Sequence, residues 1–323
     1  MKATAVAHPM QALVKYHGLK DWKLRLPYHD SISVNLDSLA TTTTVEFGDF
    51  AEDSISIDGV DRKGDVLTRA LSIIDIIRQR AKLSDRVRVT SRNNLPLGEV
   101  KGLGYSSSGG AALAAAAFKA AGLEQDIGWD VKLISTIARH LAGSACRSVT
   151  GEYSRWYAGH GNDSSFSQRF AGPSDLDMGI VIVPLSADFS TEQAHREAEK
   201  SAFFVSRIDV ARKRVDKMEK AIKTGLLEKV AELAELDSLE LHAITMTGPS
   251  RLVLLRPESL VVIDFVRKLR SDRHLPVFFS MQTGPSVFIN TYPEYVEEVI
   301  SGIKSLNLNA IKSNIGEGVR IVG

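Results

Sequence analysis

The stretch KGLGYSSSGGAALAAAAF, residues 101–118, contains the residue types with which proteins hold a phosphate group. Its glycines allow tight turns that leave backbone N–H groups free, and the hydroxyl groups of Ser106, Ser107 and Ser108 are further donors. The alanine-rich run that follows is a strong helix former, so the positive end of a helix dipole would lie beside the serines. No Gly-Lys-Ser/Thr follows at the spacing of a Walker loop. The stretch therefore predicts an anion site of another kind, with a serine-capped turn as the plainer alternative.

The segment LAGSACRSVTGEY, residues 141–153, places one arginine among small residues. Because Gly143 and Ser144 are small, a ligand can approach Arg147 closely, and a guanidinium binds a carboxylate through two parallel hydrogen bonds. A buried structural ion pair fits the same segment nearly as well. Cys146 has no basic cluster near it in the sequence that would activate the thiol, so we interpret it as a small buried residue.

Cations and aromatic side chains lie close together near the start of the chain, within residues 12–36. Lys15, Tyr16, His17 and Lys20 share one short segment, which suits a small polyanionic ligand. A solvated basic loop is the alternative interpretation. The histidines have no metal-ligand spacing with other His or Cys residues, so we expect no zinc or other metal site.

The composition is that of a globular protein with room for a large core: 323 residues, 44% of them apolar and 24% charged. The single cysteine excludes a disulfide within the chain and suits a reducing compartment. The N-terminal stretch has no apolar run of signal-peptide length, and no segment reaches the length of a membrane span. A net charge of +1 gives no electrostatic argument for binding nucleic acid or a membrane. We therefore expect a cytoplasmic protein.

Short strands are predicted to alternate with helices along the chain. Alternating, β-branched or unbroken apolar patterns predict strands over 41–47, 54–59, 86–92 and 178–185. Helical spacing extends over 66–81, 130–145, 209–222 and 226–244. Mixed, non-sequential strands favour an α+β protein of two domains over one doubly wound sheet. The polar, turn-rich stretch 158–175 suggests a boundary between domains 1–174 and 175–323.

The chain resembles the diphosphomevalonate decarboxylase branch of the GHMP kinase superfamily in six motifs. They occur in the order MQALVKYHGLK, PYHDSISVNL, GLGYSSSGG, LAGSACRS, DSLELHA and MQTGPS. The resemblance implies a ribosomal protein S5 domain 2-like N-terminal domain, a ferredoxin-like C-terminal domain, a ligand site between them and a homodimer. Members of this family use ATP to phosphorylate the 3-hydroxyl group of a mevalonate derivative. Loss of that phosphate and of carbon dioxide then follows.

The resemblance also implies roles for single residues. Arg147 would hold the carboxylate that leaves as carbon dioxide. Lys15 and Tyr16 would lie at the reacting end and the 5-phosphate, and Ser144 would bind the 5-phosphate. The other candidates for binding substrate lie in the same matched motifs: Ser106, Ser107, Ser108, His17, Lys20 and Ser31.

The chain departs from the family at the position of the catalytic aspartate, where it has Gln282. A neutral amide has no useful basicity, so it cannot activate the 3-hydroxyl group for phosphorylation. The resemblance therefore narrows to the archaeal branch that takes mevalonate 3,5-bisphosphate, needs no ATP and makes isopentenyl phosphate. We expect this reaction, with no cofactor and no metal ion, and with Gln282 as a neutral contact near C3.

Three other interpretations fit the same residues. In the first, the chain is an ATP-dependent phosphomevalonate or diphosphomevalonate decarboxylase in which another residue replaces the aspartate. In the second, it is a kinase of the same family that phosphorylates the 3-hydroxyl group without decarboxylation. In the third, it is an inactive paralogue that acts as a binding module, although the retention of Lys15, Ser144 and Arg147 argues against this.

Overall fold

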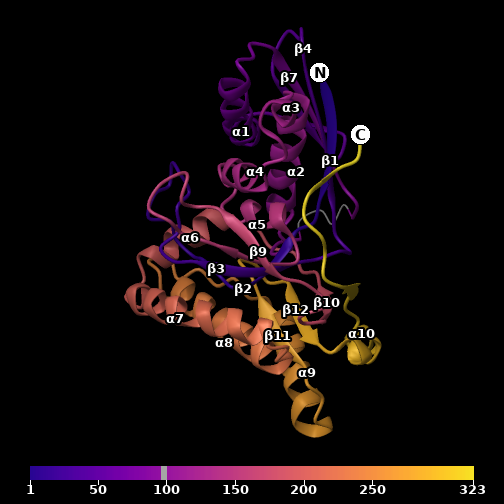
Figure 1. Ribbon diagram of the computed structural model, residues 1–323. Helices are drawn as coiled ribbons and strands as arrows, with labels where there is room; N and C mark the ends of the chain where they lie inside the picture. Colours follow the sequence, from indigo (N-terminus) through magenta and orange to yellow (C-terminus); the bar gives the residue numbers. More distant parts are fainter. Residues whose placement is uncertain (96–99) are drawn as a thin grey trace.

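The computed structural model describes residues 1–95 and 100–323, and the strands of this part form three sheets (Figure 1). The first sheet contains β1 (Lys2–Ala7), β4 (Thr41–Gly48), β5 (Ser54–Ile57), β6 (Val60–Arg62), β7 (Arg86–Asn93) and β14 (Arg320–Ile321). Their order is β14-β1-β4-β7-β5-β6, and all neighbours are antiparallel except β5 and β7. Every second residue of β4 is buried, so one face of this sheet packs against the core.

Four helices accompany this sheet: α1 (Asp65–Ala81), α2 (Tyr105–Ala120), α3 (Leu123–Ile127) and α4 (Val131–Ala138). The alanine-rich α2 packs on β1 and β4, and its alanines are buried. Small side chains also bring α2 close to α5 (Ala145–Thr150), because a Cβ added at Gly110 would lie only 2.8 Å from the Cβ of Ala145. The helix that begins at the glycine-serine loop and the helix that carries Arg147 are thus packed directly together.

The second sheet lies across the middle of the molecule in Figure 1. It contains β2 (Met10–Val14), β3 (Ser31–Asn35), β8 (Tyr153–Trp156) and β9 (Ser167–Ala171), in that order. Helix α5 packs against β3, β8 and β9, while two helices of the C-terminal half pack against β2. Because both faces are covered, β2 and β3 are buried at every residue.

The third sheet contains β10 (Gly179–Val183), β11 (Phe278–Met281), β12 (Val287–Thr291) and β13 (Ile311–Ser313), in the order β11-β12-β10-β13. The helices of this half are α6 (Thr191–Glu199), α7 (Phe204–Lys223), α8 (Leu227–Met246), α9 (Pro257–Arg273), a 3₁₀ helix (Pro293–Tyr295) and α10 (Val296–Ser305). Apolar residues of α9 and α10 form one cluster with one face of the sheet. Those of α7 and α8 form a second cluster with its other face and with the second sheet.

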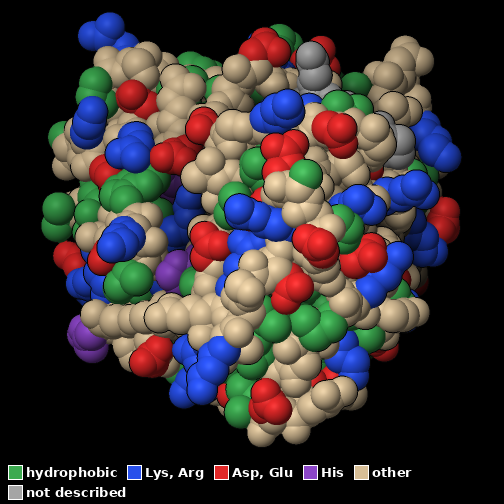
Figure 2. Space-filling view, turned by 90° about the horizontal axis from the view of Figure 1, so that it is seen from above, with side chains coloured by type: hydrophobic (Ala, Val, Ile, Leu, Met, Phe, Trp, Pro, Cys, Tyr) green, Lys and Arg blue, Asp and Glu red, His purple; other side chains and the backbone are tan. Residues whose placement is uncertain are grey.

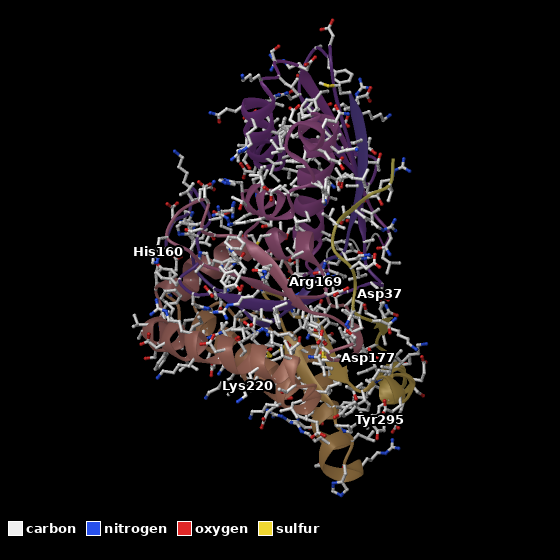
Figure 3. All side chains as sticks on the ribbon, viewed as in Figure 1. Asp37, His160, Arg169, Asp177, Lys220 and Tyr295 are labelled. Carbon is white, nitrogen blue, oxygen red and sulfur yellow. The ribbon has the colours of Figure 1, made fainter. Side chains whose placement is uncertain are left out.

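The last residues return to the first half of the chain and run beside β1 (Figure 1). The N–H of Gly316 donates to the carbonyl of Asn35 at 2.8 Å, and the N–H of Val319 donates to the carbonyl of Val149 in α5 at 3.1 Å. Asp37, labelled beside this segment in Figure 3, accepts a hydrogen bond from the N–H of Asn314 at 2.7 Å. The C-terminal segment therefore connects β1, β3 and α5.

The structure confirms the four strands expected over 41–47, 54–59, 86–92 and 178–185 and the helix over 66–81. The single helix expected over 130–145 is wrong, because α4 ends at Ala138 and a turn precedes α5. The turn is stabilised by the buried guanidinium of Arg139, which donates to the carbonyl of Leu24 and to Asn162 Oδ1, the latter at 2.7 Å. Among the helices of the described ranges, none is both long and apolar enough to cross a membrane.

Candidate functional site

A cavity of about 560 Å³ has walls from β2, from the loop before α2, from the starts of α5 and α6, and from the residues after β11. These walls come from distant parts of the sequence, so the cavity exists only in the folded chain. Several residues singled out from the sequence line it together: Lys15, Tyr16, Ser106, Ser144, Arg147 and Gln282. The expected gathering of cations, hydroxyl groups and an amide is present in one place.

Arg147 is fully buried in α5 and lines this cavity. Its Nε and Nη1 atoms have no hydrogen-bond partner, and no carboxylate pairs with it within residues 1–95 and 100–323. The guanidinium carbon lies 5.7 Å from the ring centroid of Tyr16 and 5.9 Å from that of Trp156. Burial lowers the pKa of Arg147, although an arginine remains charged. This is a buried cation that is available to an anion, and not the structural ion pair that the sequence also allowed.

Gly143 lets the aromatic wall approach this arginine. A Cβ added there would lie 2.8 Å from Trp156 Cη2 and 2.9 Å from the Tyr16 hydroxyl. Any larger residue would therefore push these rings away. Cys146 lies in the same segment and is buried. Burial raises the pKa of its thiol to about 12. The expectation of an unreactive, buried cysteine is confirmed.

Lys15 follows directly after β2 and is buried. Its ammonium donates to Ser280 Oγ at 3.1 Å and to the carbonyl of Ala234 at 3.4 Å. Burial lowers the pKa of Lys15 to about 8, and the nearby carboxylate of Asp237 opposes this effect. The side chain is therefore a cation at neutral pH that releases its proton more readily than an ordinary lysine.

The carboxylate of Asp237 fixes the position of the backbone at Lys15. It lies in α8, is fully buried and accepts a hydrogen bond from the N–H of Lys15 at 3.0 Å. Its charge is matched by Arg207, which forms a close ion pair with it, and by Arg214 at 3.6 Å. Removal of the carboxylate would leave two buried guanidinium groups without this counter-charge.

The loop before α2 turns through Gly102 and Gly104, whose φ angles of 88° and 82° favour glycine. Ser106, in the first turn of α2, lines the cavity. Ser107 Oγ instead donates to the carbonyl of Gly104 at 2.5 Å, and Ser108 Oγ shares a hydrogen bond of 2.6 Å with Thr41. Of the three serines, only Ser106 lines the cavity, while the other two hold the start of the helix in place.

Gln282 is buried at the edge of the cavity and is bound to the backbone on both sides of it. Its Nε2 donates to the carbonyl of Met10 at 3.0 Å and to that of Gly102 at 3.1 Å. Its Oε1 accepts a hydrogen bond from the N–H of Ala12 at 3.1 Å. The amide thus joins β2 to the loop before α2, and an acid in its ionised form could not make the two donations.

Two neighbours of Gln282 extend this connection. Ser286 Oγ donates to the carbonyl of Lys101 at 2.5 Å and accepts from the N–H of Leu185 at 3.0 Å. A Cβ added at Gly284 would lie 2.7 Å from the backbone nitrogen of Gly102, so the two backbones are in contact. Residues 282–286 therefore support the loop that leads into α2.

Comparison with known proteins identifies the family. Residues 7–167 match the model of the diphosphomevalonate decarboxylase-like N-terminal domain, and residues 187–317 match that of the mevalonate 5-diphosphate decarboxylase C-terminal domain. The chain belongs to the diphosphomevalonate decarboxylase family. A phosphomevalonate decarboxylase from Haloferax volcanii is 43% identical over 300 residues, which cover 93% of this chain and 91% of that protein.

Solved structures of the same family confirm the expected two-domain GHMP-like fold. Mevalonate diphosphate decarboxylase from Staphylococcus aureus is similar with a TM-score of 0.91 and 28% identity, covering 100% of this chain and 98% of that one. The enzyme from Enterococcus faecalis is similar with a TM-score of 0.90 and 27% identity, covering 100% and 99%. The family resemblance found from the six motifs is confirmed as well.

Besides Ser107 and Ser108, three further candidate residues of this decarboxylase-family chain do not line the cavity. His17 is buried behind it and shares a hydrogen bond of 3.1 Å with Thr245. Lys20 is exposed, and its ammonium donates to the carbonyl of Gly159 at 2.5 Å. Ser31 is fully buried in β3. Any part that these three play in binding would be indirect in this conformation.

Two lining residues on α6 were missed by the sequence analysis, namely Thr191 and His195. A histidine within a polar helix has no local feature that marks it as a site residue. Its neighbours in space are Tyr16 and Gly18, and Gly18 lies 177 positions earlier in the sequence. Only the folded arrangement reveals it.

The described lining of the cavity is positively charged. It contains Lys15, Arg62, Lys101 and Arg147, against a single acid, Asp58. On the face shown in Figure 2, basic and acidic side chains are interspersed. Within the described residues no group of three or more His, Cys, Asp or Glu side chains is arranged to hold a metal ion. The site suits a small molecule with several negative charges.

Proposed function

We propose that this chain converts mevalonate 3,5-bisphosphate to isopentenyl phosphate, inorganic phosphate and carbon dioxide without ATP. The observation that carries the proposal is the hydrogen bonding of Gln282. By resemblance, this residue has the position of the family's catalytic aspartate. It is a neutral amide whose two N–H groups are both bound to backbone carbonyls. In this state it does not act as a base toward a 3-hydroxyl group.

The other acids near the cavity support the same proposal. Asp58 is the only acid in the described lining, and both of its carboxylate oxygens accept hydrogen bonds from Asn93, at 2.8 and 3.0 Å. Asp237 does not line the cavity, and Arg207 and Arg214 neutralise it. Asp237 is paired with arginines outside the cavity, and Asp58 lies at the turn after β5 and not at the position of the family's aspartate, so a substrate that already carries its 3-phosphate fits the site better.

In the proposed reaction, the C3–O bond breaks and its electron pair goes to the departing phosphate. The electrons of the C1–C2 bond form the C2–C3 double bond as carbon dioxide leaves. Ser106 and the N–H groups at the start of α2 are fixed donors for the charge that grows on the phosphate. The ammonium of Lys15 adds positive charge, and Arg147 holds and orients the carboxylate. The protein thus binds, orients and stabilises charge.

The decisive experiment is a matched set of turnover assays on one purified preparation. Mevalonate 3,5-bisphosphate, mevalonate 5-phosphate and mevalonate 5-diphosphate are each incubated with and without Mg-ATP, and isopentenyl products, phosphate and carbon dioxide are measured. We expect turnover of the bisphosphate alone, at a rate that ATP does not change. The Arg147→Lys variant, purified in the same way, controls for contaminating enzymes. Obligatory consumption of one ATP for each turnover would refute the proposal.

A second candidate function is the ATP-dependent decarboxylation of mevalonate 5-phosphate. It is favoured by the 43% identity to the Haloferax volcanii phosphomevalonate decarboxylase. A second cavity of about 250 Å³ also adjoins the first at Ser106 and is lined by Ile55, Ile57 and Val89 among others. An apolar recess beside a phosphate-binding loop suits the base of a nucleotide. Turnover of mevalonate 5-phosphate only in the presence of ATP would establish this alternative.

A further inference from the structure

A closed ring of hydrogen bonds joins the ammonium of Lys15 to three residues that do not line the described part of the cavity. The ammonium donates to Ser280 Oγ of β11 at 3.1 Å and to the carbonyl of Ala234 of α8 at 3.4 Å. Ser238 Oγ, one turn further along α8, lies 3.2 Å from Ser280 Oγ and donates to the same carbonyl at 2.8 Å. Ala234, Ser238 and Ser280 are fully buried, so bulk water does not compete for these hydrogen bonds.

The hydroxyl hydrogens of this ring can point in only one direction. Ser238 has a single hydroxyl hydrogen, which it donates to the carbonyl of Ala234, and its oxygen accepts from the N–H of Met281 at 2.9 Å. In the contact between the two serines, Ser280 must therefore be the donor. The lone pairs of Ser280 Oγ are then presented to Lys15, whose ammonium has three hydrogens and no lone pair. Ser238 thus orients Ser280 as an acceptor for the ammonium.

The surroundings of Lys15 give this acceptor its importance. Burial lowers the pKa of Lys15 to about 8, and the carboxylate of Asp237 on α8 opposes this effect. Three guanidinium groups lower the pKa further, those of Arg147 on α5 and of Arg207 and Arg214 on α7. His242 of α8 is a neutral neighbour, because burial lowers its pKa to about 4. Positive charge therefore outnumbers negative charge around the ammonium, and a hydrogen bond that it donates stabilises its charged form.

We propose that Ser280 is a positioning residue, which holds Lys15 as a charged ammonium at neutral pH and leaves one of its N–H groups for the substrate. One ammonium hydrogen is bound to Ser280 and one to Ala234. Within residues 1–95 and 100–323 the third has no acceptor, and Lys15 lines the cavity. Without the hydroxyl of Ser280, the ammonium would lose its fixed direction and would release its proton at a lower pH. This inference rests on the proposed function, because it assigns to Lys15 a contact with the substrate.

The first measurement follows the ionisation of Lys15 directly and needs no substrate. Protein labelled with carbon-13 at the lysine ε-carbons is titrated by NMR from pH 6 to pH 9.5, and Lys15→Arg identifies the signal of Lys15. Ser280→Ala removes the hydroxyl, and Ser280→Thr retains it. Ser280→Cys offers only a weak acceptor in a similar shape, so the test does not depend on the folding of the alanine variant. Ser301→Ala, at an exposed position of α10, is the matched control.

The second measurement is kcat/KM for mevalonate 3,5-bisphosphate over the same pH range. We expect Ser280→Ala and Ser280→Cys to move both the titration of Lys15 and the alkaline fall of kcat/KM to lower pH by about one pH unit or more, the size of one hydrogen bond to a charged group. At pH 8 their kcat/KM should be roughly fivefold or more below that of wild type, and the loss should shrink toward pH 6 as Lys15 regains its proton. Ser280→Thr should keep both properties near those of wild type, and Ser301→Ala should match it.

Two results would overturn the inference. One is a titration of Lys15 that Ser280→Ala and Ser280→Cys leave unmoved, or that Ser280→Thr moves as far as they do. The other is a loss of kcat/KM of the same size at every pH, which a purely structural role of Ser280 would produce. Absence of turnover of the bisphosphate would refute only the proposed function, because the titration of Lys15 is measured without substrate.

Discussion

Replacement of Gln282 by glutamate tests whether its amide holds the loop before α2 in place. The two side chains have the same length, so Gln282→Glu changes only the hydrogen-bonding groups. One carboxylate oxygen can still accept from the N–H of Ala12, as Oε1 does now at 3.1 Å. The other oxygen would face the carbonyls of Met10 and Gly102, where Nε2 now donates at 3.0 and 3.1 Å. Both donations would be lost, and three oxygens would meet without a hydrogen between them.

The size of the effect follows from these contacts. Two lost hydrogen bonds cost about 1 kcal/mol each, and the two carbonyls left without donors add about 1 kcal/mol or more each. We therefore expect Gln282→Glu to lower the free energy of unfolding by about 3–5 kcal/mol at pH 8. The buried carboxyl has a folded-state pKa above its unfolded value near 4.3, because its protonated form can restore one donation. The deficit should then be small near pH 4, should grow as the pH rises from the unfolded-state pKa to the folded-state pKa, and should level off above it.

The assay is urea denaturation of wild type and variant between pH 5 and pH 8, with kcat/KM for mevalonate 3,5-bisphosphate measured in parallel. Gln79→Glu, at an exposed position of α1, controls for the added charge. Gln282→Ala should keep more activity than Gln282→Glu, because it places no negative charge beside the phosphates. A Gln282→Glu variant as stable as wild type at pH 8, or with a deficit that does not change with pH, would show that the amide is not the link described here.

Three further predictions concern the rest of the site. Arg147→Lys should lower kcat/KM by roughly a hundredfold with unchanged circular dichroism, because an ammonium does not reproduce the two-pronged contact; near wild-type turnover would place the carboxylate site elsewhere. Asp237→Asn should lower the free energy of unfolding in urea by about 3–5 kcal/mol, because the buried Arg207 loses its close ion pair and keeps only Glu240 at 3.6 Å as a counter-charge, and an unchanged unfolding midpoint would contradict this. The pH profile of kcat/KM should fall above about pH 8 as Lys15 loses its proton, and Lys15→Arg should move this fall to higher pH; a profile that stays level to pH 9.5 would exclude the ammonium from the binding step.

Local patterns predicted the parts of the fold whose signal lies within one element. A run of β-branched threonines indicated β4, and an unbroken apolar run indicated the fully buried β10. No such pattern marks β14, which is two residues long and pairs with β1 at the opposite end of the sequence. The helix expected over 130–145 failed for a related reason. Its interruption depends on the contacts of Arg139 with Leu24 and Asn162, which no local propensity contains.

The candidate site likewise contains residues that the sequence predicted and a residue that it did not. Residue types and motif order were sufficient to predict that Arg147, Lys15, Ser106 and Ser144 lie at one site, because all four fall in motifs of the family, and the structure places them around one cavity. His195 could not be found, because its meaning comes from a hydrogen bond with Gly18, 177 positions earlier. The role of Gln282 as a neutral contact near C3 stays a prediction. Its links to Met10 and Gly102 extend over 272 and 180 positions.

The path of the C-terminal segment affects the stage of synthesis at which the ligand site becomes complete. Every residue that the structure places in the wall of the main cavity precedes position 284, so the ribosome produces all of them before residues 316–321. Yet the carbonyl of Val149, in the helix of Arg147, receives its hydrogen bond from Val319, and the edge of β1 is covered by residues 320–321. A nascent chain halted before residue 316 would contain the complete set of ligand-binding side chains, but the edge of β1 would be open and α5 would lack its hydrogen bond from Val319. Competence to bind should thus appear only after residues 316–321 have left the exit tunnel and paired with the N-terminal half.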